Sequence, residues 1–396
     1  MKVQEPEVEA SEKLPHLLKY MGSKREIIDF VKESIFSLEV KDTWLCDLFA
    51  GTGIVSGHLK ADYNIHANDI QEYSSILSNT YLSKIKGKVI PDIIDDIYFN
   101  VCKLVTDFRS KNPDLIFDYT EVKHFNQFIE LEKKQQNLLH YKFDLGFHLF
   151  AKCYSGTYWS YEQCLWIDAI RAVAEQYNGK VEYYAILSSL IYSMSYASQS
   201  TGHYAQYRDA TVENMKDIMV YRKKDIWTNF EKKFHDILKI NGNSRDFRVT
   251  TLDYVDCLRV IENNSIVYAD PPYQSVHYSR FYHALETLVK YDYPKLLYKG
   301  RYREERHQSP FCKKTTVKEA FSILFKGVKD KNSHLVLSYS DTGMITLEEI
   351  QKLSKQFLND MYSSYVLEKD HIHSKMGRND GHNQEVTEYS IIFKRK

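Results

Sequence analysis

Short apolar runs that end in turn residues alternate with amphipathic segments near the start of the chain. The run at 44–49 contains one acid, Asp47, and leads into Ala-Gly-Thr-Gly and then a helix-like stretch. A second run at 63–69 ends at Asp69 and precedes an amphipathic segment at 70–85. Strand, glycine turn, helix and strand in this order form a βαβ unit with parallel strands. The pattern therefore predicts an α/β fold built on a mostly parallel sheet.

This alternation is interrupted in the middle of the chain. Between 96 and 244 long helical and aromatic stretches dominate, and strand-like runs then return. The later strand-like segments are 248–258, 265–273, 333–341 and 388–396. The last two indicate an antiparallel edge strand. We therefore expect a split α/β core, formed by 14–95 and 245–396, with an inserted, mostly helical domain at 96–244.

The N-terminal region predicts a disordered lead-in followed by a helix. Residues 1–13 are polar and acidic, so we expect them to be disordered. A helix is expected to begin near Ser23, which follows the Gly22 turn and is a favoured N-cap residue. Its apolar positions lie at helical spacing on one face: Ile27, Ile28, Phe30, Val31 and Ile35.

The charge balance neither favours nor excludes nucleic acid as a partner. Lys plus Arg total 53 and Asp plus Glu total 53, so the net charge is zero, whereas many DNA-binding domains are basic. A local basic surface is still enough to contact phosphates. The 31 Tyr and 20 Phe suit stacking on bases, although an AT-rich genome produces a similar enrichment.

Cysteine spacing and hydropathy exclude several other classes. The six cysteines are scattered without CxxC spacing, so we expect neither a disulfide framework nor a bound metal. The N-terminus lacks the apolar stretch of a signal peptide. No apolar run approaches the ~18 residues of a membrane span. We therefore expect a soluble, cytoplasmic protein.

The glycine turn and the acid after the second strand predict a nucleotide-like ligand. Glycines allow the backbone to approach a ligand, and the following helix presents free amides. The spacing of Gly51, Gly53 and Gly57 departs from the GxGxxG of nicotinamide-binding loops, which disfavours an oxidoreductase. Asp69 lies where an acid can accept ribose hydroxyls. A plain turn and a helix N-cap are the structural alternatives for these two features.

Tyr-Ala-Asp-Pro-Pro-Tyr at 268–273, directly after an apolar strand, is the strongest chemical signal. The prolines make the loop rigid. The Asp270 carboxylate and the Pro271 carbonyl are two acceptors for the hydrogens of a planar exocyclic amine, and Tyr273 can stack on the base. Such a loop favours attack of the amine on an electrophile through positioning and electrostatics.

These motifs, in this order, resemble the Dam-type family of DNA adenine methyltransferases in the alpha arrangement. The matching segments are Lys-Tyr-Met-Gly-Ser-Lys (19–24), Asp-Leu-Phe-Ala-Gly-Thr-Gly (47–53), His-Ala-Asn-Asp-Ile (66–70), Thr-Thr-Leu-Asp-Tyr (250–254) and Ala-Asp-Pro-Pro-Tyr (269–273). The resemblance implies a Rossmann-like fold with a seven-stranded sheet. It also implies S-adenosyl-L-methionine as cofactor and double-stranded DNA as substrate, in a restriction–modification system with a possible restriction endonuclease partner.

The resemblance also implies roles for individual residues. Asp69 would hold the ribose of the cofactor, Asp253 would pair with the cofactor's adenine amine, and Tyr254 would flank that ring. The remaining cofactor-pocket residues would be Tyr20, Lys24, Phe49, Gly51, Gly53 and Asp270. The catalytic residues would be Asp270, Pro271, Pro272 and Tyr273.

Candidate DNA contacts come from polar-aromatic and basic loops. The side chains we select are Arg208, Tyr278, Arg280, Arg301, Arg303 and Arg306. The segment 277–283, which includes His283, either closes over a flipped base or packs its aromatic residues in the core. The inserted domain is expected to choose the DNA sequence. Alternative readings are methylation of a cytosine amine or an RNA adenine, and an inactive DNA-binding protein.

Overall fold

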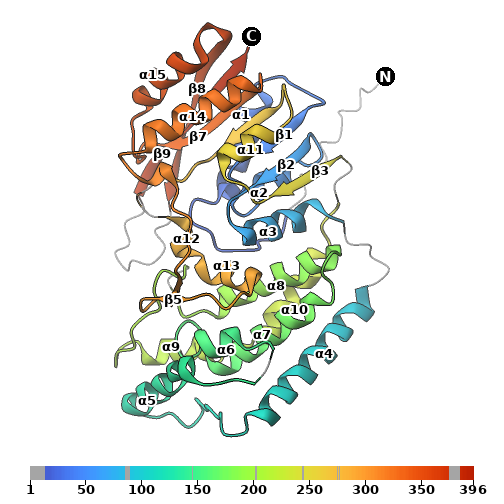
Figure 1. Ribbon diagram of the computed structural model, residues 1–396, viewed down its shortest axis with the longest axis vertical. Helices are drawn as coiled ribbons and strands as arrows, with labels where there is room; N and C mark the ends of the chain where they lie inside the picture. Colours follow the sequence, from blue (N-terminus) through green and yellow to red (C-terminus); the bar gives the residue numbers. More distant parts are fainter. Residues whose placement is uncertain are drawn as a thin grey trace, which may run out of the picture.

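The computed structural model describes residues 14–84, 90–144, 146–200, 203–242, 245–273, 275, 277–373 and 384–396. The expected disordered segment 1–13 lies outside the described residues. A seven-stranded sheet forms the upper layer of the molecule in Figure 1, and a group of helices lies below it.

The sheet has the order β3-β2-β1-β4-β7-β9-β8. Its strands are β1 (Trp44–Asp47), β2 (Asn64–Asn68), β3 (Phe247–Thr250), β4 (Ile266–Ala269), β7 (His334–Ser340), β8 (Tyr362–His373) and β9 (Gln384–Arg395). β3, β2, β1, β4 and β7 pair in parallel, and β9 runs antiparallel to both β7 and β8. The predicted parallel α/β sheet with antiparallel pairing at one end is confirmed.

The last strand lies one position in from the edge of the sheet. Hydrophobicity at 388–396 predicts β9, but β8 was not expected because it carries the charged residues Glu368, Lys369 and Asp370. β8 pairs along its whole length with β9, for example Val366 opposite Ile391. β9 is therefore paired with a strand on each side, and β8 forms the edge of the sheet.

Successive side chains along each strand point to opposite faces of the sheet and pack into two separate hydrophobic cores. Leu45 and Ile266 pack on the side of α1 (Ile28–Phe36), α2 (Ile54–Leu59) and α3 (Glu72–Leu82). Their neighbours Cys46 and Val267 pack on the opposite side, against α11 (Tyr254–Val260), α14 (Val317–Asp330) and α15 (Leu347–Leu358). This alternation is the period of two that a strand imposes.

The predicted helix near Ser23 is present, with a short 3-10 turn first. The Ser23 hydroxyl accepts a hydrogen bond from the Arg25 amide at 3.4 Å and caps η1 (Lys24–Ile27), which continues into α1. This arrangement fixes Lys24 at the beginning of the helix, where it is buried.

The chain leaves the sheet after α3 and returns at β3. The helices between them are α4 (Ile90–Lys111), α5 (Phe125–Gln136), η3 (Asn137–His140), α6 (Leu149–Cys153), α7 (Tyr161–Glu175), α8 (Val181–Ala197), α9 (Met215–Arg222) and α10 (Ile226–Ile237). In Figure 1, α8 and α10 lie directly below α3. The described part of this region therefore contributes no strand to the sheet.

A segment that follows β4 also packs among these helices. It contains α12 (Tyr278–Phe281), α13 (His283–Lys290), β5 (Leu296–Leu297) and β6 (Tyr302–Arg303). The Arg171 guanidinium of α7 donates to the carbonyls of Leu288 and Val289 at 2.9 and 3.0 Å. The segment thus joins the loop at 270–273 to the helical region, and the domain boundaries near 95 and 244 remain a prediction.

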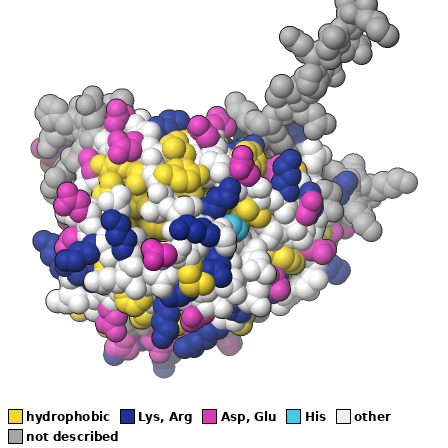
Figure 2. Space-filling view, turned by 90° about the horizontal axis from the view of Figure 1, so that it is seen from above, with side chains coloured by type: hydrophobic (Ala, Val, Ile, Leu, Met, Phe, Trp, Pro, Cys, Tyr) yellow, Lys and Arg dark blue, Asp and Glu magenta, His cyan; other side chains and the backbone are white. Residues whose placement is uncertain are grey.

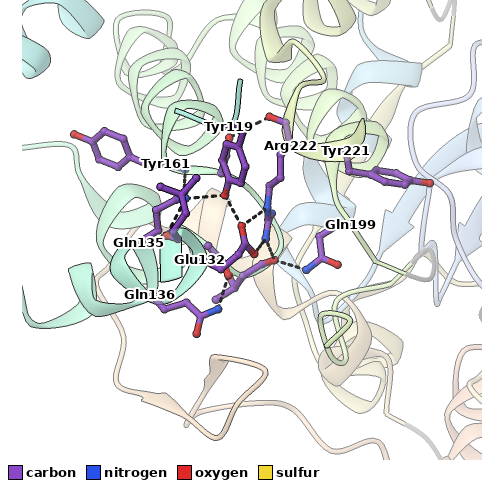
Figure 3. Close-up of polar contacts among 12 residues, drawn as sticks. Tyr119, Glu132, Gln135, Gln136, Tyr161, Gln199, Tyr221 and Arg222 are labelled. Carbon is purple, nitrogen blue, oxygen red and sulfur yellow. Dashed lines mark hydrogen bonds and ion pairs between the residues drawn. The ribbon is translucent and has the colours of Figure 1, made fainter. Parts of the chain in front are cut away.

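A buried ion pair holds part of the helical region together (Figure 3). The Arg222 guanidinium donates to the two carboxylate oxygens of Glu132 at 2.9 and 2.5 Å and to the Thr157 carbonyl at 2.8 Å. Tyr119 donates to Glu132, and Gln135 donates to the Tyr119 hydroxyl at 2.7 Å. These bonds connect α5, α9 and the loop before α7.

Positive and negative side chains are interspersed on the face shown in Figure 2, in keeping with the zero net charge. Within the described ranges, no helix combines the length and the apolar character that crossing a membrane requires.

Candidate active site

A pocket opens at the carboxyl ends of β1, β2 and β4, where ligands bind in parallel α/β sheets. Its empty volume, open mouth included, is about 1030 Å³. Residues of five predicted motifs line it: Tyr20, Lys24, Phe49, Gly51, Asp69, Asp253, Tyr254, Asp270, Pro271, Pro272 and Tyr273. Segments distant in sequence therefore meet in one cavity.

Hydrogen bonds to two carboxylates, those of Asp47 and Asp69, hold the glycine turn in place. The Asp47 carboxylate accepts hydrogen bonds from the amide and hydroxyl of Ser56 at 3.3 and 2.8 Å. Asp69 accepts from the amides of Gly51 and Gln71, both at 2.9 Å. Burial raises the pKa of Asp69, and these amide bonds oppose the shift. Asp69 thus acts within the protein as a cap, in addition to lining the pocket.

Gly53 is the one predicted cofactor residue that is absent from the pocket lining. Its φ is +74°, and a Cβ atom there would lie 2.8 Å from the Ser78 Cα and 2.7 Å from its hydroxyl. Gly53 therefore allows α2 to begin close against α3. Gly51, with φ +54°, faces the pocket, and a Cβ there would lie 3.1 Å from the Tyr20 ring.

One side of the pocket is aromatic. The Phe49 and Tyr254 rings are stacked with centroids 6.0 Å apart, and Phe311 from η4 (Pro310–Cys312) meets both rings edge-on, at 5.6 and 5.1 Å. Asp253 lies beside them and caps α11 by accepting from the Val255 amide at 2.9 Å. The Asp253 carboxylate thus lies beside flat apolar faces, a combination suited to a nucleoside.

Asn68 was not singled out from the sequence, yet it holds two pocket loops. Its side-chain amide donates to the carbonyls of Leu48 and Leu252, both at 3.1 Å. Its oxygen accepts from the Leu252 amide at 3.1 Å and from the Thr250 hydroxyl at 2.8 Å. The signal available in the sequence was the position of Asn68 directly before Asp69, the expected ribose acid.

Lys24 and Asp270 form an ion pair inside the pocket, with 2.9 Å between nitrogen and oxygen. The Glu388 carboxylate of β9 lies 3.7 Å from the same ammonium and accepts a hydrogen bond from the Tyr273 hydroxyl at 3.3 Å. We call Lys24, Asp270, Tyr273 and Glu388 the buried cluster. The side chains of Lys24 and Glu388 are 5% and 1% exposed and that of Asp270 is 17% exposed, so Asp270 faces the cavity.

Burial sets the electrostatics of this cluster. It raises the pKa of Asp270 to about 6, with Lys24 opposing and Glu388 reinforcing the shift. Burial also disfavours the charge on Lys24, but Asp270 and Glu388 outweigh it and raise the pKa of the ammonium. Asp270 is therefore mainly ionised at neutral pH, and Lys24 is charged.

Tyrosines form the wall opposite the aromatic pair. Tyr20 stacks on Tyr278 at 5.3 Å and on Tyr282 at 4.7 Å. The Tyr282 hydroxyl accepts from the Met21 amide at 2.8 Å, and both Tyr282 and His283 are fully buried. Tyr278 lines the pocket, whereas Tyr282 and His283 belong to the core. The segment at 277–283 thus contains both the pocket-facing and the core-packing residues that the sequence left as alternatives.

The candidate DNA-contacting arginines occupy different environments. Arg303 is buried and donates to both oxygens of Asp292 at 2.6 Å. Arg208 pairs with Asp217 at 2.5 Å, and Arg301 donates to the Gln136 carbonyl at 3.4 Å. Two arginines lie over the Tyr302 ring: Arg280 and Arg306. Arg306 lines a neighbouring pocket together with Gln71 and Ser279, which also line the main pocket.

Three buried side chains meet behind the sheet: Cys46, His66 and Cys257. The two sulfurs are 3.9 Å apart, and His66 Nε2 lies 3.9 Å from the Cys257 sulfur and 2.9 Å from the Thr250 hydroxyl. We describe this group as a hydrogen-bonded cluster joining β1, β2 and α11. The expectation of no bound metal stays a prediction.

The strand order and the pocket at the carboxyl ends of its strands define a Rossmann-like methyltransferase fold. Residues 20–353 match the family model described as D12 class N6 adenine-specific DNA methyltransferase, so the chain belongs to this family. The resemblance inferred from the motifs is confirmed.

Several curated relatives match the chain at modest sequence identity. The chain is 24% identical over 348 residues to "Modification methylase LlaI" of Lactococcus lactis subsp. lactis, covering 87% of this chain and 49% of that protein. It is 27% identical over 386 residues to "Type II methyltransferase M.FokI" of Planomicrobium okeanokoites, covering 95% and 52%. For "Type II methyltransferase M.NlaIII" of Neisseria lactamica the values are 23% over 353 residues, 86% and 88%. The chain thus spans about half the length of the first two relatives.

Proposed function

We propose that this protein transfers a methyl group from S-adenosyl-L-methionine to the exocyclic amine of adenine in double-stranded DNA. The observation that carries the proposal is the meeting of the Asp270 loop with the glycine turn and Asp69 in one pocket. Membership of the adenine-specific family supports the choice of base.

The pocket residues fit the proposed cofactor. When bound, the cofactor supplies an electrophilic methyl group on a sulfonium. Asp69 would hold the ribose hydroxyls, and Asp253 with the Phe49 and Tyr254 rings would hold the adenine. The fit rests on the pocket's own chemistry: its lining combines the Asp69 and Asp253 carboxylates, the Phe49–Tyr254 aromatic pair and the Gly51 backbone.

The loop at 270–273 would orient the amine. The Asp270 carboxylate accepts one amine hydrogen and the Pro271 carbonyl accepts the other, which directs the nitrogen lone pair toward the methyl group. Tyr273 was expected to stack on the base. Its ring is buried and meets Tyr339 edge-on at 5.7 Å, so in the present conformation the ring faces β7.

The DNA-contacting surface is proposed to lie around the pocket mouth. Arg306 lines a neighbouring pocket that shares Ser279 and Gln71 with the main one, and Arg280 follows Tyr278 in α12. The helical region 96–244 is proposed to select the DNA sequence. The names of the relatives motivate the further proposal of a restriction–modification system with a cognate endonuclease. Sequencing the methylated bases of a methylation-free host that expresses the gene would identify the recognition sequence.

A labelled-methyl assay tests the activity. Purified protein is incubated with methyl-labelled cofactor and duplex DNA, single-stranded DNA or RNA, and the products are digested to nucleosides. We expect label in N6-methyladenine from duplex DNA and its loss in Asp270→Ala. Label in N4-methylcytosine or only in RNA would replace the proposed substrate. Binding of DNA without transfer would favour the inactive DNA-binding alternative, and transfer that persists in Asp270→Ala would remove the catalytic assignment.

A further inference from the structure

The group formed by Cys46, His66 and Cys257, which we call the thiol cluster, combines side chains that commonly bind thiophilic metals. The three residues lie on β1, β2 and α11, are at most 1% exposed, and do not line the pocket. The sequence expectation of no bound metal rests on the absence of CxxC spacing. That rule concerns ligands that are close in sequence, whereas here the fold brings distant ligands together.

The distances within the thiol cluster fit one tetrahedral ion. Thiolate sulfurs bind zinc at about 2.3 Å and imidazole nitrogens at about 2.0 Å, so around one ion two sulfurs lie ~3.8 Å apart and a sulfur and a nitrogen ~3.6 Å apart. Here the two sulfurs are 3.9 Å apart, and His66 Nε2 lies 3.9 Å from the Cys257 sulfur. All ligand atoms of the group lie within 4.8 Å of one another. The site therefore needs little rearrangement to close around an ion.

The donor atoms favour a soft divalent cation. Sulfur and imidazole ligands suit zinc, whereas magnesium and calcium prefer oxygen. On binding, the two thiols release their protons, and the two thiolate charges balance a divalent ion. The filled site thus adds no net charge to the interior, where an unbalanced charge would be costly. The Thr250 oxygen, 2.9 Å from His66 Nε2, is placed to be the fourth ligand, while its hydrogen stays bonded to Asn68.

Hydrogen bonding alone holds the two cysteines weakly. Thiols are weak donors and weak acceptors, and both sulfur contacts in the thiol cluster are 3.9 Å long. Buried cysteines also occur as small apolar side chains. Ordinary core packing is therefore the alternative to metal binding.

We propose that the thiol cluster binds one zinc ion, which fastens three elements of the pocket from behind the sheet. Each ligand is close in sequence to an acid that lines the pocket. Asp47 directly follows the first cysteine, Asp69 lies three residues after the histidine, and Asp253 lies four residues before the second cysteine. The ion would hold these pocket loops in place and would take no part in methyl transfer.

Metal content and absorption test the proposal directly. Because the thiol cluster is buried, the ion is expected to enter while the chain folds. Untagged protein is therefore expressed in medium supplemented with zinc(II) or with cobalt(II), and it is purified under reducing conditions. Cobalt(II) is the probe, since its thiolate complexes absorb light and those of zinc do not. We expect one ion per chain by elemental analysis, and a sulfur-to-cobalt charge-transfer band in the cobalt protein.

Unfolding in urea supplies a second readout. An ion that binds the folded chain lowers the unfolding equilibrium constant by mass action. With free zinc at about one hundred times its Kd, the constant should fall about hundredfold relative to protein kept with a chelator.

Three variants show whether these side chains are the ligands. Cys257→Ala and His66→Asn should lose both the band and the bound cobalt, and zinc should no longer stabilise them. Cys164→Ala is the matched control, because Cys164 is equally buried but lies outside the thiol cluster. It should keep the metal and the band. Circular dichroism confirms that each variant is folded, and Cys46→Ala replaces any variant that is not.

Two results would overturn the proposal. Wild-type protein without bound metal and without the band would show that the three side chains are ordinary core residues. Cobalt that persists in Cys257→Ala would show that the ion is bound elsewhere. Neither result bears on the proposed function, which the labelled-methyl assay tests separately. A metal-loaded protein that transfers no methyl groups would keep this inference and remove the proposed function.

Discussion

The Lys24 ammonium lies 2.9 Å from the Asp270 carboxylate, although one residue begins the first helix and the other follows the fourth strand. The pair is largely shielded from water, so its electrostatic interaction is stronger than that of a surface pair. It links the N-terminal motif to the loop that is proposed to hold the target amine.

Acid should slow the wild-type reaction. Burial raises the pKa of Asp270 from an ordinary value near 4 to about 6, so below pH 6 the proposed acceptor becomes protonated. The rate should fall about tenfold per pH unit there. Measurement of kcat between pH 4.5 and pH 8 with a stability control checks this. A flat profile down to pH 5 would contradict the assignment.

Replacing Lys24 by Gln should move the same limb the other way. The Lys24 charge opposes protonation of Asp270, so its removal raises the pKa of Asp270 and shifts the limb to higher pH. This variant also shows which carboxylate produces the acidic limb of the pH profile. Asp47 lines the same pocket, and burial raises its pKa to about 7. An unshifted limb would point to Asp47 or to substrate.

Asp69→Asn tests the proposed ribose contact. Loss of the carboxylate should weaken cofactor binding by roughly 1–3 kcal/mol, the cost of an unmade hydrogen bond to a charged group. A 2′-deoxy analogue of S-adenosylhomocysteine provides the control. It should bind wild type more weakly than the parent compound, and Asp69→Asn should bind both equally. If loss of the 2′-hydroxyl weakens binding by the same factor in both proteins, Asp69 acts only as a hydrogen-bond acceptor for the amides of Gly51 and Gln71.

Gly53→Ala should destabilise the fold by about 1–3 kcal/mol, because it adds both backbone strain and a steric clash. The clash is with the Ser78 backbone, which cannot rotate away. Gly179→Ala is the matched control: its φ is +81°, but no atom lies within 4 Å of the added Cβ. The excess loss in Gly53→Ala, read from urea unfolding, isolates the clash. Equal losses would show that strain alone matters.

Arg222→Met should destabilise the protein by about 3–5 kcal/mol, because Glu132 would remain buried without its partner. The Arg222 side chain is fully buried, with bonds to Glu132 and Thr157. Arg109→Ala breaks an exposed pair with Glu162 and should change stability little. Similar urea midpoints for the two variants would contradict the role given to the Arg222 pair.

The sequence was sufficient to place most of the pocket, for a topological reason. Loops that follow parallel strands meet at one edge of the sheet, so motifs after β1, β2, β3 and β4 had to converge. Glu388 could not be found in this way. It lies within β9, away from any turn or motif, and it pairs with β8, whose charged residues resemble a loop in the sequence.

Sequence reasoning was also weak wherever a side chain's partner decides its role. Arg303 lies in a basic loop that reads as a DNA contact, yet Asp292 occupies its guanidinium. Gly53 belongs to the glycine turn but serves the packing of α2 on α3. In both cases the sequence shows the type of residue, but it does not show the distant partner that decides the role of the side chain.

The position of β9 between β7 and β8 bears on biosynthesis. β8 is translated before β9, its sheet neighbour among the described strands, so its amides and carbonyls must wait for a later segment. The same later strand brings Glu388 to Lys24. A nascent chain therefore cannot bring Lys24, Asp270 and Glu388 together until β9 has been translated.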